Sequence, residues 1–147
     1  MKQLIYFGIL FLILSACSNP ENTSDTDSSN EKLSSFEFEH GIGPISDTVE
    51  LDVFNPELAR QGRQLFSAKC LSCHSKDTRL LGPAYGSWLQ ERSVEFIMNF
   101  TMNPVENIRN HPIGKALHVE YMIEMPNQNI SRDEARSIIE YLRSYHQ

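Results

Sequence analysis

Hydrophobic residues near the end of the chain recur at intervals of three and four positions. This spacing places them on one face of a helix and the intervening polar residues on the other. They are Ala135, Ile138, Ile139 and Leu142. The stretch before them, Ser131-Arg132-Asp133-Glu134, fits a capping box, in which the Ser and Glu side chains each bind the other residue's backbone N–H. The pattern predicts a helix that starts after Ser131 and runs almost to the end of the chain.

A second helical pattern precedes Cys70. Asn55 is a suitable N-cap, Pro56 suits the first helical position, and small or apolar residues then follow along one face. These are Leu58, Gly62, Leu65 and Phe66. A glycine inside a helix costs roughly 1 kcal/mol relative to alanine, so Gly62 indicates that another backbone comes close. We expect the C-terminal helix to be that neighbour.

Two shorter helices are predicted between these. Ser93 can cap a helix that Asn103-Pro104 stops. It carries Val94, Ile97, Met98 and Thr101 on one side and Phe96 and Phe100 on the other. A further short helix is expected after Pro112, with Ile113, Leu117 and Tyr121 in register. The chain has no internal repeat, and the pattern predicts one all-α domain of three to five helices over residues 54–147.

The beginning of the chain has the pattern of a signal peptide. Lys2 is followed by an apolar run from Leu4 to Leu14, which is too short to cross a bilayer. The run ends in Leu14-Ser15-Ala16-Cys17, which resembles a bacterial lipobox and implies cleavage before Cys17 and diacylation of its thiol. Residues 1–16 are then a lipoprotein signal peptide, and the protein is attached to a membrane. The alternative is an ordinary secretory signal that leaves Cys17 as a free thiol.

Residues 17–53 differ sharply in composition from the rest of the chain. From position 18 to 53 there are nine acidic residues and one basic residue, whereas residues 54–147 hold 11 basic and 10 acidic residues. Positions 19–30 have no side chain able to anchor a core, so we predict an acidic, flexible tether. As a coil it would span roughly 30–36 Å. Residues 36–38 and 49–53 alternate like short strands and could dock on the domain as extended pieces, but a solvated linker is expected for the first. The near-neutral domain does not favour nucleic-acid binding.

The most specific motif is Cys70-Leu71-Ser72-Cys73-His74. It is the attachment signature of c-type haem, because two thiols one helical turn apart can each add to a vinyl group of one porphyrin, with the adjacent imidazole under the iron. A zinc site would need a second Cys or His pair, and a thioredoxin-like pair would need alternating strands and helices. Neither pattern is present, so we predict one covalent haem c. Its attachment requires an oxidising compartment outside the cytoplasm, and the signal peptide would direct the chain there.

Together these residues resemble class I bacterial cytochromes c. In that family a helix with a Gly and an aromatic, matched by Gly62 and Phe66, crosses a C-terminal helix matched at Tyr141 and Leu142. The resemblance implies His74 as the proximal iron ligand and a carbonyl of Pro83, in Gly82-Pro83, as the acceptor for its second ring nitrogen. It implies a Met in the loop before the last helix as the sixth ligand, matched best by Met125-Pro126. It covers about two-thirds of the chain.

The sixth ligand has several candidates in the sequence. Met125 is favoured because it lies in a loop six residues ahead of Ser131, where a side chain can be aimed without breaking a helix; Met122 is the alternative. A methionine on an apolar helical face is more often core filler, which fits Met98. The other candidates are Met102, His111 and His118, and the two histidines are expected to be surface or capping residues. His40 and His146 are not candidates for the sixth ligand.

Further residues are expected to surround the haem. Apolar side chains that can pack against the porphyrin are Leu71, Leu81, Tyr85, Trp88, Ile97 and Ile123. Arg79, Arg92 and the indole N–H of Trp88 are candidate donors to the haem propionates. A Met ligand raises the reduction potential and leaves no open position on the iron. The sequence therefore predicts an electron carrier and not an enzyme. The alternatives are a five-coordinate haem sensor or peroxidase-type protein and a non-haem module.

A narrower resemblance concerns the redox partner. Residues 91–103 and 125–141 resemble small cytochromes that accompany nitrous-oxide reductase in some bacteria. This implies a copper enzyme of the cell envelope as the electron acceptor, a role in respiration, and a periplasm-facing haem domain held at a membrane through Cys17. No small-molecule substrate is expected.

Overall fold

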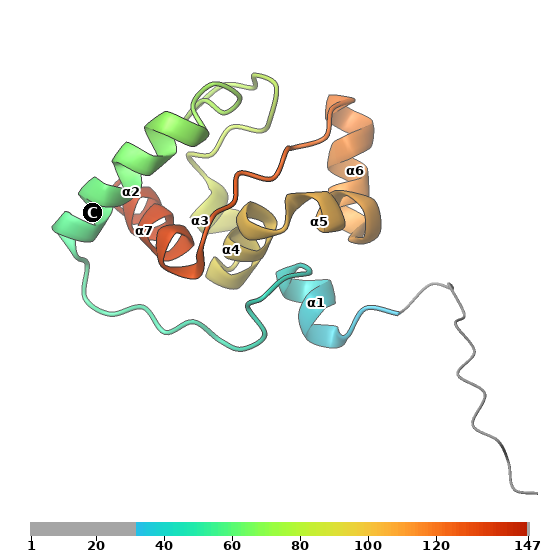
Figure 1. The fold of residues 1–147 in the computed structure, drawn as a ribbon, viewed down its shortest axis with the longest axis horizontal. Helices are drawn as coiled ribbons and strands as arrows, with labels where there is room; N and C mark the ends of the chain where they lie inside the picture. The colour runs from blue at the N-terminus through green and yellow to red at the C-terminus, as the bar shows by residue number, and fades with distance from the viewer. Residues whose placement is uncertain (1–31, 147) are drawn as a thin grey trace, which may run out of the picture. The chain divides into compact units, whose positions relative to one another are not determined.

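The structure, a computed structural model, describes residues 32–146, and over that range it is helical without strands (Figure 1). This confirms the all-α fold class. Contacts divide the chain into two units, Met1–Asn30 and Glu31–Gln147. The helices of the second unit are α1 (Ser35–His40), α2 (Pro56–Lys69), α3 (Trp88–Glu91), α4 (Val94–Met102), α5 (Pro104–Asn110), α6 (Pro112–Tyr121) and α7 (Arg132–Arg143). None of these helices is long and apolar enough to cross a membrane.

Helices α2 and α7 form the central crossing of the fold (Figure 1). Both begin as predicted: the Asn55 side chain accepts the N–H groups of Glu57 and Leu58, and the capping box of Ser131 is formed. A Cβ added at Gly62 would overlap the carbonyl group of Ser137, so the glycine permits the close approach of the two backbones. The sequence-based explanation of Gly62 is therefore confirmed.

Helices α4, α5 and α6 follow one another along the chain with only short connections between them. Helix α4 begins after its Ser93 cap and ends at Met102, as predicted. The chain does not leave helical structure at Pro104, however, because this residue occupies the first turn of α5, where its missing N–H costs nothing. The sequence interpretation took the proline only as a stop signal. Together with the short helix α3, α5 raises the number of helices over residues 54–146 to six, above the expected three to five.

The expectation of a solvated linker is wrong for residues 36–38. Residues 35–40 form helix α1, which begins with a capping box between Ser34 and Glu37, and residues 49–53 form no strand. The side chain of Ile45 is 1% exposed and belongs to the main hydrophobic core. We call residues 34–49 the docked segment. The remaining part of the predicted tether, positions 17–31, lies outside the described residues, as does the predicted signal peptide.

Two buried asparagines hold the docked segment to α4 and α5. The Asn99 Nδ2 group donates to the carbonyl oxygens of His40, Gly41 and Ile45 at 3.0–3.1 Å, and its Oδ1 accepts the Ile45 N–H at 3.0 Å. Asn107 Oδ1 accepts the Ile42 N–H at 2.8 Å. An irregular backbone can be buried only if its polar groups find partners. These amides provide them, and this is why the segment can pack here without being a strand.

A buried carboxylate ties the start of α2 to α7. Glu140 is 0% exposed and accepts hydrogen bonds from the Asn55 N–H at 2.7 Å and from Arg136 and Arg143 at 2.5–3.0 Å. Burial alone would raise the pKa of Glu140, but these hydrogen bonds outweigh it and keep the pKa below its ordinary value. Glu140 thus remains ionised and fixes the relative position of the two helices.

Candidate haem-binding site

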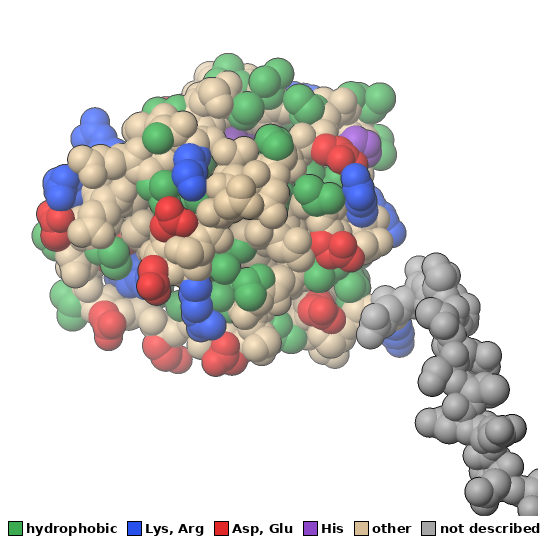
Figure 2. Space-filling view, in the orientation of Figure 1, with side chains coloured by type: hydrophobic (Ala, Val, Ile, Leu, Met, Phe, Trp, Pro, Cys, Tyr) green, Lys and Arg blue, Asp and Glu red, His purple; other side chains and the backbone are tan. Residues whose placement is uncertain are grey.

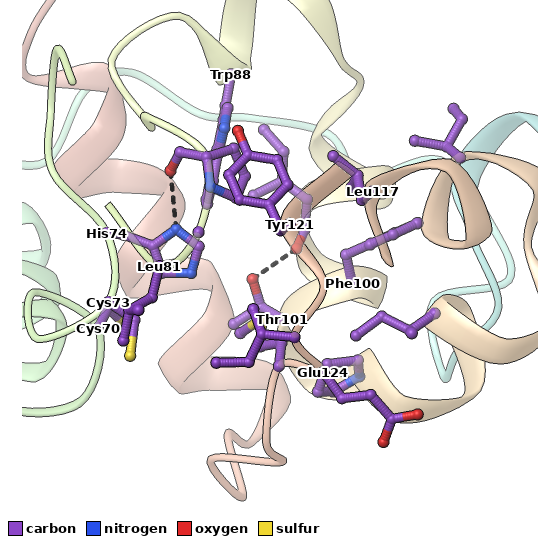
Figure 3. Close-up of a pocket in the computed structure, with 18 of the residues that line it drawn as sticks. Cys70, Cys73, His74, Leu81, Trp88, Phe100, Thr101, Leu117, Tyr121 and Glu124 are labelled. Atoms are coloured by element: carbon purple, nitrogen blue, oxygen red, sulfur yellow. Dashed lines mark hydrogen bonds between the residues drawn. The ribbon is translucent and has the colours of Figure 1, made fainter. Parts of the chain in front are cut away.

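A largely apolar cavity lies between the end of α2, helices α3 to α6 and the loop before α7. Figure 3 shows Cys70, Cys73 and His74 on one side of it and Phe100 and Leu117 on the other. Aliphatic, aromatic and proline side chains supply most of the lining. They include Leu81, Trp88, Phe96, Ile97, Phe100, Pro104, Ile108, Ile113, Leu117 and Ile123.

The two cysteines are brought to the cavity by the end of α2. The backbone N–H groups of Cys73 and His74 both donate to the Cys70 carbonyl, at 3.1 and 2.9 Å, which turns the chain tightly. Cys70 is buried and Cys73 is half-buried, and both line the cavity. Burial raises the pKa of Cys70 to about 11.

His74 is oriented by the partner that the family resemblance implies. Its Nδ1 lies 2.9 Å from the Pro83 carbonyl oxygen (Figure 3). A neutral imidazole that donates through Nδ1 leaves Nε2 free as a metal ligand. Burial lowers the pKa of His74, which favours this neutral form. A Cβ added at Gly82 would overlap the His74 ring, so the glycine makes room for the histidine.

The candidate sixth ligands are separated clearly by their positions. Met125 lines the same cavity as His74. Met122 is the C-cap of α6, with a left-handed backbone conformation; its side chain is 81% exposed and is not part of the lining. Met98 is 1% exposed in the core, as expected of filler, and Met102 packs against the same core. His111 is indeed a capping residue, accepting the Ile113 N–H, although it is buried and not on the surface.

His118 lies at the edge of the cavity. It contributes to the lining but is exposed, and its Nδ1 lies 3.4 Å from the Ile123 carbonyl oxygen. The other two histidines were not expected to bind the iron. His146 is exposed, and His40, in the docked segment, has its Nδ1 2.8 Å from the Ser93 hydroxyl. These two are absent from the cavity lining.

The loop that carries Met125 is fixed at several points. Arg109 of α5 pairs with Glu124 at 3.3 Å, and Lys69 of α2 donates to the Gln128 carbonyl oxygen at 3.1 Å. Asn127 accepts the Asn129 N–H, so it acts as a turn former. The loop thus has contacts on both sides of Met125, which limits how far its side chain can move.

The candidate propionate donors take different positions. Trp88 and Arg92, one turn apart at α3, both line the cavity, and the Trp88 ring stands edge-on to His74 with centroids 5.4 Å apart. Arg79 does not line the cavity and instead binds Glu120. Of the residues expected to pack against the porphyrin, Leu71 and Tyr85 are also absent from the lining. Tyr85 packs in the core with Phe66, with ring centroids 4.5 Å apart.

The sequence interpretation missed part of the lining. Pro104 and Ile108 were not recognised, because α5 was not predicted and no periodic pattern marks so short a helix. Within residues 32–146 no three His, Cys, Asp or Glu side chains are grouped as metal ligands, a set that a zinc site of the usual kind would require.

Helices crossed in this way around an apolar cavity, with the Cys-x-x-Cys-His turn at its wall, define a haem-binding domain. The Cytochrome c family model matches residues 59–146, and the chain belongs to the cytochrome c family. No curated protein matches the chain. The residues present fit haem c: two thiols for its vinyl groups, an oriented imidazole for its iron and an apolar lining for its ring. The protein is accordingly a haem protein of the electron-transfer type.

Two solved structures extend the comparison. The cytochrome c from Rhodothermus marinus is 37% identical, with a TM-score of 0.69, over 74% of this chain and 94% of that chain. An engineered form of it, Rma TDE, bound to a carbene intermediate, is 37% identical with a TM-score of 0.66, over 74% of this chain and 95% of that chain. The similarity thus covers nearly all of the related chains.

Proposed function

We propose that the protein is a membrane-tethered mono-haem cytochrome c whose iron is held by His74 and Met125 and which carries electrons to an oxidoreductase of the cell envelope. The observation that carries this proposal is the position of Met125 on the lining of the cavity that also contains Cys70, Cys73 and His74. When bound, haem c supplies a one-electron ferric/ferrous couple whose potential a thioether ligand raises.

The protein's own residues perform three tasks in this function. Pro83 holds the proximal imidazole in one orientation. The apolar lining excludes water, which keeps the surroundings of the iron similar in both oxidation states. Trp88 and Arg92 line the cavity and carry an indole N–H and a guanidinium, and we assign to them the binding of haem propionates.

The ligand assignment is tested by comparing two methionine variants. Met125→Ala should lose the weak near-infrared charge-transfer band of Met-ligated ferric haem, lower the reduction potential and allow added ligands to bind the iron. Met122→Ala is the matched control, three residues away and exposed, and should retain all three properties. If the control loses the band and Met125→Ala keeps it, Met122 is the ligand.

The same measurements separate the proposed carrier from a five-coordinate sensor or peroxidase-type protein. A carrier with both axial positions filled should bind added cyanide or imidazole weakly in the unmodified protein and readily in Met125→Ala. Ready binding to the unmodified protein would favour the alternative.

Covalent attachment of the haem is tested separately. Cys70→Ala combined with Cys73→Ala should remove all covalent haem, detected by haem staining of a denaturing gel.

Attachment to a membrane rests on the lipobox-like sequence that ends at Cys17. Because the docked segment begins at residue 34, the chain available for reach runs from position 17 to 34, at most about 60 Å when extended. A Cys17→Ser variant should appear in the soluble fraction with an unchanged spectrum and potential. Haem that still sediments with membranes would contradict lipid anchoring.

A nitrous-oxide reductase is the acceptor that the sequence resemblance in residues 91–103 and 125–141 supports. These ranges contain α4, the Met125 loop and most of α7. Reduced protein mixed with purified nitrous-oxide reductase and nitrous oxide should be reoxidised at a rate proportional to the enzyme concentration. Reoxidation no faster than without the enzyme would remove this acceptor from the proposal and leave the carrier function intact.

A further inference from the structure

A line of aromatic rings leads from His74 to the surface at the end of the chain. The Trp88 ring stands edge-on to His74, with centroids 5.4 Å apart (Figure 3), and Tyr85 follows at 6.2 Å from Trp88. Tyr145 lies 6.0 Å from Tyr85, and Tyr141 lies 5.1 Å from Tyr145. We call Trp88, Tyr85, Tyr141 and Tyr145 the aromatic relay. Because Tyr85 and Tyr141 are buried and Tyr145 is half-buried, the relay connects the His74 side of the cavity with solvent.

The three tyrosine hydroxyl groups of the relay meet one another. The Tyr145 hydroxyl donates to that of Tyr141 and lies 3.5 Å from that of Tyr85. Phenylalanine would fill nearly the same volume without the cost of burying a hydroxyl group, so filling the core does not by itself require three phenols. Burial raises the pKa of Tyr85 and of Tyr145, which keeps both of them neutral. A neutral phenol that loses an electron must also release its proton, and the adjoining hydroxyl groups offer that proton a path.

We propose that the aromatic relay carries oxidising equivalents from the haem site to the surface when the haem-loaded protein reacts with a peroxide. The proposal rests on a haem held at Cys70, Cys73 and His74, and it does not depend on the electron-carrier function. Indole and phenol side chains are harder to oxidise than a haem iron, so the relay is silent during ordinary electron transfer. A peroxide is a strong enough oxidant to draw an electron from it.

The electrons and protons of this reaction balance. Reduction of one hydrogen peroxide to two waters consumes two electrons and two protons. Ferrous iron gives one electron and becomes ferric, and a tyrosine of the relay gives one electron together with the proton of its O–H bond. Solvent supplies the other proton. The tyrosyl radical left behind recovers one electron and one proton from a small reductant such as ascorbate.

The surroundings of Tyr145 suit the end of such a path. The Lys76 ammonium group lies 4.5 Å from the centroid of the Tyr145 ring. Its charge disfavours a positive charge on the ring, so the electron leaves Tyr145 together with the proton and a neutral radical remains. On the face of the domain drawn in Figure 2, basic and acidic side chains are interspersed. No single sign of charge dominates that face, so a small charged reductant is not repelled from it.

The test locates the radical after one equivalent of hydrogen peroxide is added to the ferrous, haem-loaded protein. The spin trap 2-methyl-2-nitrosopropane captures the radical, and mass spectrometry of peptides identifies the residue that carries the adduct. We expect the adduct mainly on Tyr145. Tyr85→Phe keeps a ring of similar volume but removes an oxidisable phenol, and should lower the adduct on Tyr145 about fivefold or more without disturbing the packing.

Tyr145→Phe removes the surface end of the relay. The oxidising equivalent then stays near the haem, so loss of the Soret band per equivalent of peroxide should increase severalfold. Both tyrosine variants should keep the visible spectrum and the reduction potential of the unmodified protein. These two measurements separate an interrupted relay from a damaged haem site.

The matched control is Phe38→Tyr, which adds a phenol outside the relay at a side chain that is 62% exposed. A radical formed in solution would attack this exposed phenol, whereas a radical that travels through the relay should leave it almost free of adduct. Tyr121 serves as a second reference, because it lines the cavity but is not part of the relay. It shows whether the radical stops at a phenol beside the haem.

Three results would overturn the proposal. The first is an adduct that is absent from Tyr145, or that forms mainly on Tyr121 or on the phenol added in Phe38→Tyr. The second is an unchanged amount of adduct on Tyr145 in Tyr85→Phe. The third is unchanged loss of the Soret band in Tyr145→Phe.

Met125→Ala distinguishes failure of the relay from failure of the proposed function. Opening the iron to peroxide should raise the total yield of adduct in this variant without moving it away from Tyr145. A yield that stays the same contradicts the assignment of Met125 as a ligand, and the positions of the adduct still decide whether the relay exists.

Discussion

The contact between α2 and α7 and the contact between the docked segment and α4–α5 are both buried, but different chemistry holds each of them. The first is a helix crossing made by a glycine, aromatic rings and aliphatic side chains, with Phe66 and Tyr141 centroids 5.5 Å apart. The second is an irregular chain whose backbone groups bind the amides of Asn99 and Asn107. The first contact depends mainly on shape, with the hydrogen bond between Glu140 and the Asn55 N–H fixing the start of α2, and the second depends mainly on hydrogen bonds.

This difference determines what each contact can tolerate. A helix crossing has no spare volume where two backbones meet, so any added atom must displace a helix. A hydrogen-bonded segment can lose a partner and still remain near its place, but the groups left behind are buried without partners. Substitutions should therefore act globally at the first contact and locally at the second.

The largest effect is expected at the helix crossing. Gly62→Val places side-chain atoms where the Ser137 carbonyl lies, and we expect a loss of more than about 4 kcal/mol in the free energy of unfolding, the range of severe core disruption. Denaturant titration of the haem-loaded protein measures it. Arg63→Val, at the neighbouring exposed position of α2, is the control and should be nearly neutral. Equal stability of the two variants would contradict the close approach of the helices.

A smaller and more local effect is expected at the docked segment. Asn99→Ala leaves three carbonyl groups and the Ile45 N–H without their partner, and should cost about 2–3 kcal/mol. Hydrogen exchange should accelerate at residues 40–45 and remain slow in α2 and α7. Asn127→Ala, in an exposed turn, is the control. Acceleration spread equally over all helices would show that the two contacts are not independent.

The docked segment should also respond to pH through His111. This residue is 1% exposed, its Nδ1 accepts the Ile113 N–H, and its Nε2 lies 3.1 Å from the Phe38 carbonyl oxygen. Burial lowers the pKa of His111, so the folded protein binds this proton less readily than the unfolded chain. Stability is then fully present above the ordinary histidine pKa of about 6.5 and falls as the pH decreases below it.

Denaturant titrations between about pH 7.5 and 5 measure this dependence, within the range where histidine titrates. His111→Asn retains a capping side chain and should give a flatter profile. The lowered pKa of Glu140 acts only at lower pH, because a carboxylate loses its contribution as it is protonated below about 4.5. An unchanged slope in His111→Asn would show that another group is responsible.

The smallest effect is expected for an exposed ion pair between α7 and the docked segment. Arg132 of α7 lies 3.9 Å from Asp47 of the docked segment, and both side chains are more than half exposed. Arg132→Ala should change the free energy of unfolding by less than about 0.5 kcal/mol. A loss comparable to that of Asn99→Ala would mean that charge, and not the buried amides, holds the segment.

The two contacts also differed in how far they could be predicted from sequence. Helices α2 and α7 have apolar residues at helical spacing and recognisable caps, and Gly62 marked the crossing itself. The docked segment has no periodic pattern, because single residues such as Ile45 anchor it and its partners are asparagines on other helices. Asn99 and Asn107 looked like ordinary polar positions. Their role depends on what is packed against them, which short-range patterns do not contain.

At the candidate site, short motifs were sufficient for the proximal side. Cys70, Cys73, His74 and Pro83 lie close together in sequence, and the structure brings His74 and Pro83 into contact. The opposite wall is assembled from α4, α5 and α6, whose relative positions depend on long-range packing. Hence Pro104 and Ile108 were missed, and Leu71 and Tyr85 were placed beside the haem although they do not line the cavity.

The position of the docked segment has a practical consequence for producing the protein. The family match begins at residue 59 and the change in composition lies near residue 54, so both suggest an expression boundary close to α2. A protein cut there would lose the side chain of Ile45 from its core and leave the Asn99 and Asn107 amides without their backbone partners. Truncated forms should therefore begin ahead of Ser34, the N-cap of the first helix, and affinity tags or fusion partners should be attached there.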